Sequence, residues 1–205
     1  MASIEHSKKP PQWLALHFPH MALDQHNRGL GQESRDMPLA VSDKLAGRQC
    51  IIDRNPAAER AGIRLGMPAG AALSLLDSLQ VSVRNRRAEK AVLKRLASWC
   101  YQYSSQVCID HQRNSLLLEI GASQRLFGPA EPLTEHIVSG LGQLGYRAVS
   151  GIAPTPEAAH LSARHGLHIR NSADIRKSIA ALDIDSLNLK PAEIQAPVSY
   201  THLRA

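Results

Sequence analysis

The stretch Trp13-Leu14-Ala15-Leu16-His17-Phe18, followed directly by Pro19, decides how the rest of the chain is interpreted. It is a short apolar run that a proline ends, and this pattern favours a buried β-strand over a helix. Residues 1–11 are polar and end in two prolines, so we expect a flexible tail that buries nothing. The first core strand is therefore predicted at residues 12–18.

Downstream of residue 85 the patterns alternate between helix and strand. Apolar positions between Arg86 and Tyr103 share one helical face, which predicts an amphipathic helix. The later elements are expected as strands at 106–110 and 115–120, a helix at 131–144 and a strand at 148–153. With the first strand, this order is β-α-β-β-α-β, which predicts an α+β, ferredoxin-like layer.

Residues 19–85 then form an insertion after the first strand, and 86–165 complete the layer. Within the insertion we expect strands at 38–42 and 49–53, and short helices at 56–61 and 68–76. Asn55 is the predicted cap of the first of these helices, with Pro56 in its first turn. After the last strand, Thr155 and Pro156 predict the start of a helix that stops at Gly166.

Composition sets limits on location and partners. The 24 Lys and Arg against 18 Asp and Glu give a net charge of +6, which is compatible with an acidic polymer as partner. No apolar run approaches the roughly 20 residues of a membrane span, and no secretory signal precedes the fold, so a cytoplasmic protein without membrane association is predicted. Cys50, Cys100 and Cys108 lack metal-type spacing, and we expect reduced thiols in a core.

Several stretches resemble, in order, segments of Y-family translesion DNA polymerases. They are Pro38-Leu39-Ala40-Val41, Ala61-Gly62-Ile63-Arg64-Leu65-Gly66-Met67-Pro68, Leu117-Leu118-Glu119-Ile120-Gly121, Ser123-Gln124-Arg125-Leu126-Phe127-Gly128 and Gly151-Ile152-Ala153-Pro154. The resemblance covers about residues 12–196. It implies a palm made of strand one and residues 86–165, a fingers insertion at 19–85, and a partial helical thumb at 166–196. Residues 197–205 fit no family pattern and resemble translated sequencing adaptor, so we expect a non-native tail on a truncated chain.

Polymerases of this family need carboxylates at the end of strand one and in the hairpin, because two Mg²⁺ ions must be held there. By resemblance, the strand-one position falls on His17, and neutral imidazole is a poor Mg²⁺ ligand. The hairpin pair falls on Asn114 and Ser115 when aligned from the C-terminal side, or on Arg113 and Asn114 when aligned from the N-terminal side. A third alignment preserves one acid, Asp110, but requires extra residues after it.

The family's triphosphate contacts are also replaced. Its tyrosine and arginine in the fingers fall on Pro56 and Glu59, and its two lysines after the fourth strand fall on Pro156 and His160. Glu59 would repel the phosphates that the family's arginine holds. The motifs of the scaffold are present, whereas the functional positions carry other residues. This combination resembles the catalytically degenerate, ImuB-like branch of the family. The resemblance implies that the chain has no catalytic residues, no metal and no cofactor.

This resemblance implies a non-catalytic role in the SOS response, translesion synthesis and induced mutagenesis. The implied partners are damaged DNA, an ImuA-type protein, an error-prone C-family DNA polymerase, and a sliding clamp bound through a C-terminal region not seen here. The alternative is an active Y-family lesion-bypass polymerase with an atypical Mg²⁺ site around Asp110 and Glu119. A ferredoxin-like domain that binds a small ligand is a third hypothesis.

Two further groups of residues each allow a functional interpretation and a simpler structural one. The basic stripe, which is a candidate for DNA binding or an ordinary solvated helix face, consists of Arg84, Arg86, Arg87, Lys90, Lys94 and Arg95. The pairs His17/His20 and His165/His168 have a spacing compatible with metal ligands. Two histidines without a nearby carboxylate or thiolate make a weak site, so we assign no zinc to them.

Overall fold

The computed structural model describes residues 11–28, 37–165, 167, 169, 171, 173 and 174. Its centre is a four-stranded antiparallel sheet of order β5-β6-β1-β7, here called the palm sheet. Its strands are β1 (Trp13–His17), β5 (Val107–Asp110), β6 (Ser115–Glu119) and β7 (Val149–Ala153). This strand order, with helices between β1 and β5 and between β6 and β7, is that of a ferredoxin-like layer, so the predicted α+β fold is confirmed.

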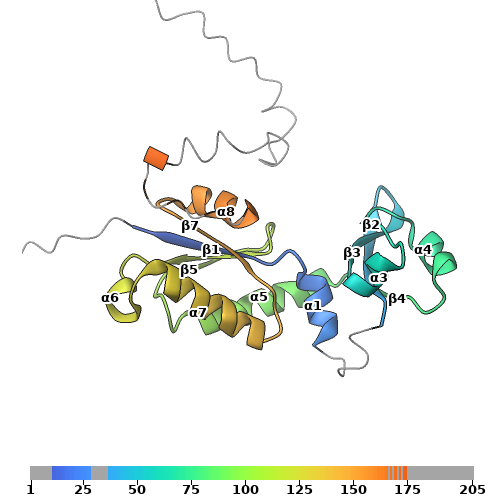
Figure 1. The fold of residues 1–205 in the computed structure, drawn as a ribbon, viewed down its shortest axis with the longest axis horizontal. Helices are drawn as coiled ribbons and strands as arrows, with labels where there is room; N and C mark the ends of the chain where they lie inside the picture. Colours follow the sequence, from blue (N-terminus) through green and yellow to red (C-terminus); the bar gives the residue numbers. More distant parts are fainter. Residues whose placement is uncertain are drawn as a thin grey trace, which may run out of the picture.

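Helices cover both faces of the palm sheet (Figure 1). The helices α5 (Arg86–Cys100) and α7 (Ala130–Gln143) lie on one face, and α8 (Pro156–His165) lies on the other. The short helix α6 (Gln124–Phe127) precedes α7. None of these helices, nor any other in the described ranges, is long and apolar enough to cross a membrane.

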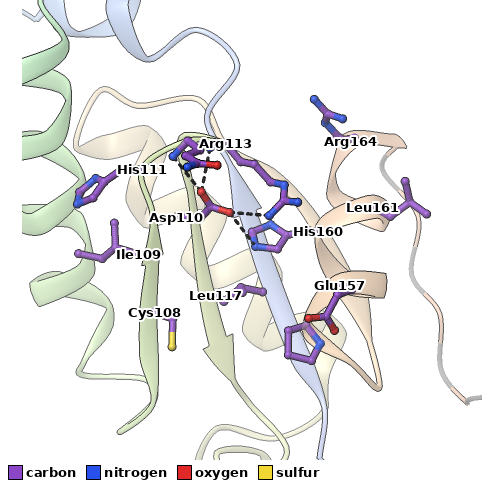
Figure 2. A pocket seen from close by; sticks show the side chains of 12 residues that line it. Cys108, Ile109, Asp110, His111, Arg113, Leu117, Glu157, His160, Leu161 and Arg164 are labelled. Carbon is purple, nitrogen blue, oxygen red and sulfur yellow. Dashed lines mark hydrogen bonds and ion pairs between the residues drawn. The ribbon is translucent and has the colours of Figure 1, made fainter. Parts of the chain in front are cut away.

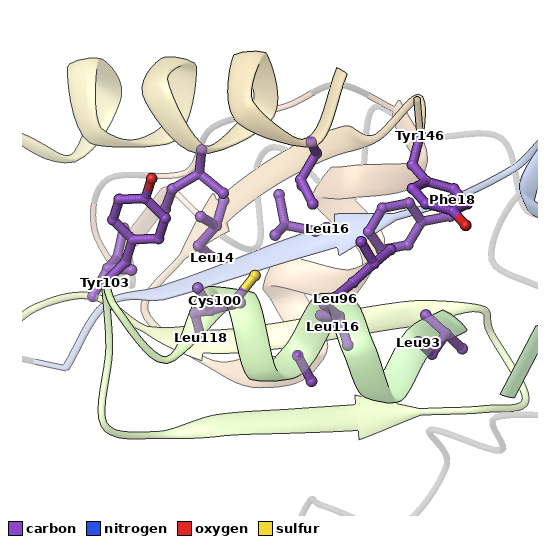
Figure 3. Packing of buried hydrophobic residues seen from close by; sticks show 14 of the residues in the cluster. Leu14, Leu16, Phe18, Leu93, Leu96, Cys100, Tyr103, Leu116, Leu118 and Tyr146 are labelled. Carbon is purple, nitrogen blue, oxygen red and sulfur yellow. The ribbon is translucent and has the colours of Figure 1, made fainter. Parts of the chain in front are cut away.

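Strand β1 sends alternate side chains to the two faces, as a pleated strand must. Leu14, Leu16 and Phe18 point toward α5 and α7, where they join the largest apolar cluster (Figure 3). Ala15 faces α8 instead and packs in a smaller cluster with the alanines of that helix, Ala158, Ala159 and Ala163. The two layers therefore meet the same strand through different residues.

Helix α5 matches the predicted amphipathic pattern over most of its length. Asn85 caps it by accepting a hydrogen bond from the backbone N–H of Ala88 at 3.0 Å. The buried apolar residues on its inner face include Val92, Leu93, Leu96 and Cys100. The helix ends at Cys100, three residues before the predicted end, and Tyr103 is buried in the turn that follows.

The insertion carries its own sheet, of order β3-β2-β4, here called the insertion sheet. It consists of β2 (Leu39–Leu45), β3 (Arg48–Arg54) and β4 (Gln80–Val83), and the helices α3 (Pro56–Arg60) and α4 (Ala69–Leu75) pack against it. The turn between β2 and β3 has positive φ at Ala46 (47°) and Gly47 (80°), as a type I′ hairpin turn requires. Strand β4 pairs in parallel with β2 and was not predicted.

Helix α1 (Met21–Asn27), also not predicted, joins the two sheets. The buried carboxylate of Asp24 accepts hydrogen bonds from the backbone N–H (2.9 Å) and Nε (2.8 Å) of Arg147, just before β7. The ring Nδ1 of His20 lies 2.9 Å from Oδ1 of Asp53 on β3. The connection is thus tied to the palm through Asp24 and to the insertion sheet through His20.

Some predictions fall outside the described residues. These are the tail over 1–10, the thumb over most of 166–196, the tail 197–205 and the partner His168. One prediction about the described part is wrong: Cys50 and Cys100 are buried, but Cys108 is exposed. Position 108 points to the α8 side of β5, which is the edge strand of the palm sheet, and α8 does not cover it.

Candidate functional site

The three palm strands β5, β6 and β1 carry a row of polar residues at one end of the sheet. Ser115 is the direct partner of His17 on one side and of Asp110 on the other. All three positions alternate with residues of the apolar core, so their side chains belong to the α8 face. We call His17, Ser115 and Asp110 the polar row.

His17 is held at the end of β1 by the hairpin loop. Its Nδ1 lies 3.0 Å from the carbonyl oxygen of Arg113 and 3.3 Å from Oγ of Ser115. Since a carbonyl only accepts, Nδ1 carries the proton and donates it. Burial lowers the pKa of His17, and the hydrogen bond to Arg113 opposes this effect without cancelling it. His17 is therefore a neutral imidazole at pH 7.

The last residue of the hairpin loop, Asn114, contacts the residue that follows β1. The backbone N–H of Phe18 donates to the carbonyl of Asn114 at 3.0 Å, and Asn114 has φ = 47°, which asparagine tolerates well. Asn114 and Ser115 thus lie beside His17. Asp110 lies one strand further away, across Ser115.

Asp110 is engaged in holding the loop together. Its Oδ1 accepts from the backbone N–H groups of Gln112 (2.9 Å) and Arg113 (3.0 Å), and Oδ2 accepts from the Arg113 guanidinium at 2.8 Å. Oδ2 also lies 3.7 Å from Nε2 of His160 on α8 (Figure 2). Burial raises the pKa of Asp110, but the hydrogen bonds from Arg113 outweigh it, so the pKa lies below its usual value.

A cavity of about 640 Å³ opens between the hairpin and α8, next to Asp110. Pro156, His160 and Arg164, which are spaced four residues apart on α8, line one wall. Burial lowers the pKa of His160, and the nearby Arg113 lowers it further. The sequence interpretation named Arg113, Pro156 and His160 but missed Arg164 as a lining residue. The four-residue spacing along α8 is the signal that could have found Arg164.

The other predicted positions lie elsewhere. Pro56 and Glu59 belong to α3 in the insertion, where Glu59 pairs with the Arg54 guanidinium. Glu119 is at the far end of β6 from Ser115, opposite Trp13, and accepts from the backbone N–H of Gly121 at 2.9 Å. Asp110 and Glu119 therefore do not converge on one point.

The histidine spacing noted in the sequence also diverges in space. His17 turns to the hairpin loop, whereas His20 turns to Asp53. Within the described ranges, no group of three or more His, Cys, Asp or Glu side chains could hold a metal ion. The polar row itself offers one carboxylate, and that carboxylate already has an arginine partner.

The basic stripe splits into two parts. Arg84 makes a bidentate pair with the buried Glu89, with both N···O distances 2.7 Å, and Arg86 pairs with Asp43 at 2.7 Å. The remaining residues, Arg87, Lys90, Lys94 and Arg95, are exposed on α5. They lie on the helical layer opposite α8 and so on the other side of the palm sheet from the polar row.

The fold, a ferredoxin-like palm with a second sheet inserted after its first strand, is that of Y-family DNA polymerases. The impB/mucB/samB family matches residues 22–164, and the chain belongs to this family. It is similar to Protein ImuB of Caulobacter vibrioides (strain NA1000 / CB15N), with 33% identity over 139 residues that are 66% of this chain. The same values hold for the protein of strain ATCC 19089 / CIP 103742 / CB 15. The chain spans 30% of the length of these relatives.

Solved structures give the same fold at lower identity. DinB from Sulfolobus solfataricus superposes with a TM-score of 0.63 at 18% identity, covering 88% of this chain and 55% of that protein. A post-insertion binary complex of Dbh DNA polymerase gives a TM-score of 0.66 at 17% identity, covering 85% and 52% of the two chains. The expected resemblance to ImuB and the expected polymerase-like fold are both confirmed.

Proposed function

We propose that this chain is the polymerase-like part of a non-catalytic accessory protein, which positions an error-prone polymerase on damaged DNA during translesion synthesis. The observation that carries the proposal is the environment of His17. At the strand position where the family places a metal-binding aspartate, a neutral imidazole is hydrogen-bonded to the loop carbonyl of Arg113. Its direct neighbour across the sheet is Ser115, which brings no charge.

The chemistry of the donor set supports the same conclusion. Mg²⁺ prefers several oxygen ligands, with carboxylates that converge on one or two ions. The polar row contains a ring nitrogen, a hydroxyl and a carboxylate that two backbone N–H groups and a guanidinium already occupy. These residues do not fit a two-metal site.

In the whole protein, which extends well beyond this chain in the relatives, we propose contacts with an ImuA-type protein, a C-family polymerase and a sliding clamp. The palm fold would serve as the scaffold, and its exposed surfaces would contact these partners. The rival hypothesis of an active polymerase needs carboxylates that converge, and the separation of Asp110 from Glu119 argues against it.

Restoring the missing carboxylates tests the proposal on the chain itself. The triple variant H17D/N114D/S115E places three acids where β1, the loop and β6 meet. We expect no saturable Mn²⁺ binding by the unmodified chain below about 1 mM, and binding at least about tenfold tighter by the variant, measured by titration calorimetry.

A matched control adds the same three charges at exposed positions that are not neighbours along the chain, as Q80E/S98D/S105D, and should bind no better than the unmodified chain. Saturable Mn²⁺ binding by the unmodified chain that disappears with Asp110→Ala would contradict the proposal. It would show that a working metal site remains around Asp110.

A further inference from the structure

A groove lies on the helical side of the palm, between α5 and the turn that joins α7 to β7. Its volume is about 250 Å³. Its lining includes the half-buried Trp99 and Leu144 and the buried Tyr146, together with the exposed Arg28 and Arg95. No lining residue is acidic. The groove is therefore apolar inside and positively charged at the rim.

Arg28 is fixed over the groove and keeps its charge available. Its NH1 donates to the hydroxyl of Tyr146 at 2.8 Å, and its guanidinium carbon lies 4.9 Å from the centre of the same ring. A hydroxyl and an aromatic face orient an arginine without neutralising it. Gly145, at φ = 83°, leaves the room that this side chain needs, because an added Cβ would lie 2.8 Å from its Cγ.

The positive charge continues from the groove along the outer face of α5. Arg87, Lys90 and Lys94 follow one another at three- and four-residue spacing and are neighbours on the helix surface, and Arg95 connects them to the groove. We call these four residues the α5 basic face. Within the part of the chain that the structure describes, none of the four takes part in an ion pair.

The position of this face argues against DNA as its ligand. By resemblance, the polar row stands where Y-family polymerases hold their reacting ends, and it lies on the α8 side of the sheet. The α5 basic face points away from that side, because α5 packs on the opposite face of the sheet (Figure 1). A duplex held over the polar row would therefore leave the α5 basic face uncovered.

From these observations we infer that the groove and the α5 basic face dock an acidic segment of a partner protein, with an apolar side chain as anchor. Aromatic walls with an adjacent arginine are the usual composition of an interface hot spot. The basic rim would draw an acidic segment in and would discriminate against a basic one. The inference does not depend on whether the palm is catalytic.

Synthetic peptides give a direct probe. One fluorescein-labelled peptide of roughly 18 residues, about five helical turns, carries leucines and one tryptophan on one face and glutamates elsewhere. A second peptide has every glutamate replaced by lysine, and a third has its apolar residues replaced by serine. Fluorescence anisotropy at about 0.1 M salt, where charges still act over about 10 Å, reports binding to the whole chain. We expect the first peptide to bind at least about tenfold more tightly than either of the others.

The double variant K94E/R95E should weaken binding of the acidic peptide at least about tenfold. The matched control R48E/R64E makes the same charge change at exposed residues of the insertion and should leave binding unchanged. Circular dichroism of both variants checks that the fold is kept.

Several results would overturn the inference. One is that K94E/R95E and R48E/R64E weaken binding of the acidic peptide equally. Another is that the glutamate and lysine peptides bind with equal affinity. A third is that the glutamate peptide does not bind at all. A last binding measurement uses labelled single-stranded and duplex DNA in place of the peptides. If DNA binds, loses affinity only with K94E/R95E and is not displaced by the acidic peptide, the α5 basic face is a nucleic-acid surface instead.

Discussion

The two faces of the palm sheet are built from alternate residues of the same strands. One face forms the apolar core, and the other carries the polar row. On β1, Leu14, Leu16 and Phe18 are each 0% exposed and build the core with α5 and α7. On the opposite face, His17 belongs to the polar row and borders solvent. Because side chains alternate along a strand, fold and site can change independently. The apolar set packs the core of the Y-family fold, while the polar set gathers on the α8 face.

The core face should respond most strongly to substitution. Leu16→Ala removes a fully buried side chain between β1 and the helical layer, and we expect a loss of about 3–5 kcal/mol in the free energy of unfolding. Urea denaturation followed by circular dichroism measures it. Val149→Ala, at a side chain that is 37% exposed on the edge strand β7, is the control and should cost less than about 1 kcal/mol. Equal losses would mean that the two faces are not distinct.

The contact between β7 and α8 should be the next most sensitive. A Cβ at Gly151 would lie 2.1 Å from the backbone nitrogen of Ala163, so the helix must move if alanine replaces this glycine. We expect Gly151→Ala to cost about 1–3 kcal/mol and to speed hydrogen exchange in α8. The matched control is Gly142→Ala near the end of α7, where nothing lies within 4 Å, and it should be neutral or stabilising. Unchanged exchange in α8 would contradict the close packing.

His17 should make the polar face sensitive to pH. Its pKa in the folded state is lowered by burial, so the unfolded chain takes up the proton first as the pH falls. The contribution of neutral His17 is present above the usual value of 6.5 and is lost as the pH drops through that value toward the folded pKa. We expect the stability advantage of the unmodified chain over His17→Gln to shrink between about pH 8 and about pH 5. A constant difference across this range would contradict a buried neutral ring.

His20 should show the opposite dependence, with a smaller effect. The hydrogen bond to Asp53 raises the pKa of His20, so protonated His20 stabilises the fold below its usual pKa of 6.5. This contribution is lost as the pH rises through the raised value. Comparing denaturation of the unmodified chain and His20→Gln should give a difference that is larger near pH 5 than near pH 8. A difference that grows with rising pH would reverse the assigned sign.

Local patterns predicted the fold where they were long or had strong caps. The short apolar run of β1, the apolar face of α5 and the caps Asn55 and Thr155 all appear in the structure. Helix α1 was missed because its seven residues are too few for a clear helical period, and it depends on a contact between Asp24 and Arg147, 123 positions apart. Strand β4 was missed because its four residues pair in parallel with a distant strand.

The candidate site was likewise predictable only where the local sequence determines it. The resemblance to known polymerases identified His17 as a position to compare, and it gave two alignments for the hairpin pair, Asn114 with Ser115 or Arg113 with Asn114. It left the alignment of Asp110 open, since the hairpin loop has no pattern that sets its pairing. Strand pairing, which places Asp110 beside Ser115 and not beside His17, comes from the packing of the whole sheet. The pairing of Arg84 with Glu89 and of Arg86 with Asp43 also depends on contacts that local sequence does not reveal.

Primer extension by the full-length protein tests the central claim most directly. Purified protein is incubated with a labelled primer–template, deoxynucleotides and either Mg²⁺ or Mn²⁺, and the products are compared with those of the Asp110→Ala variant. The account predicts no extension above the protein-free level with either metal, for either protein. Extension by the unmodified protein that Asp110→Ala abolishes would contradict it, because a working metal site would then have to be built around Asp110.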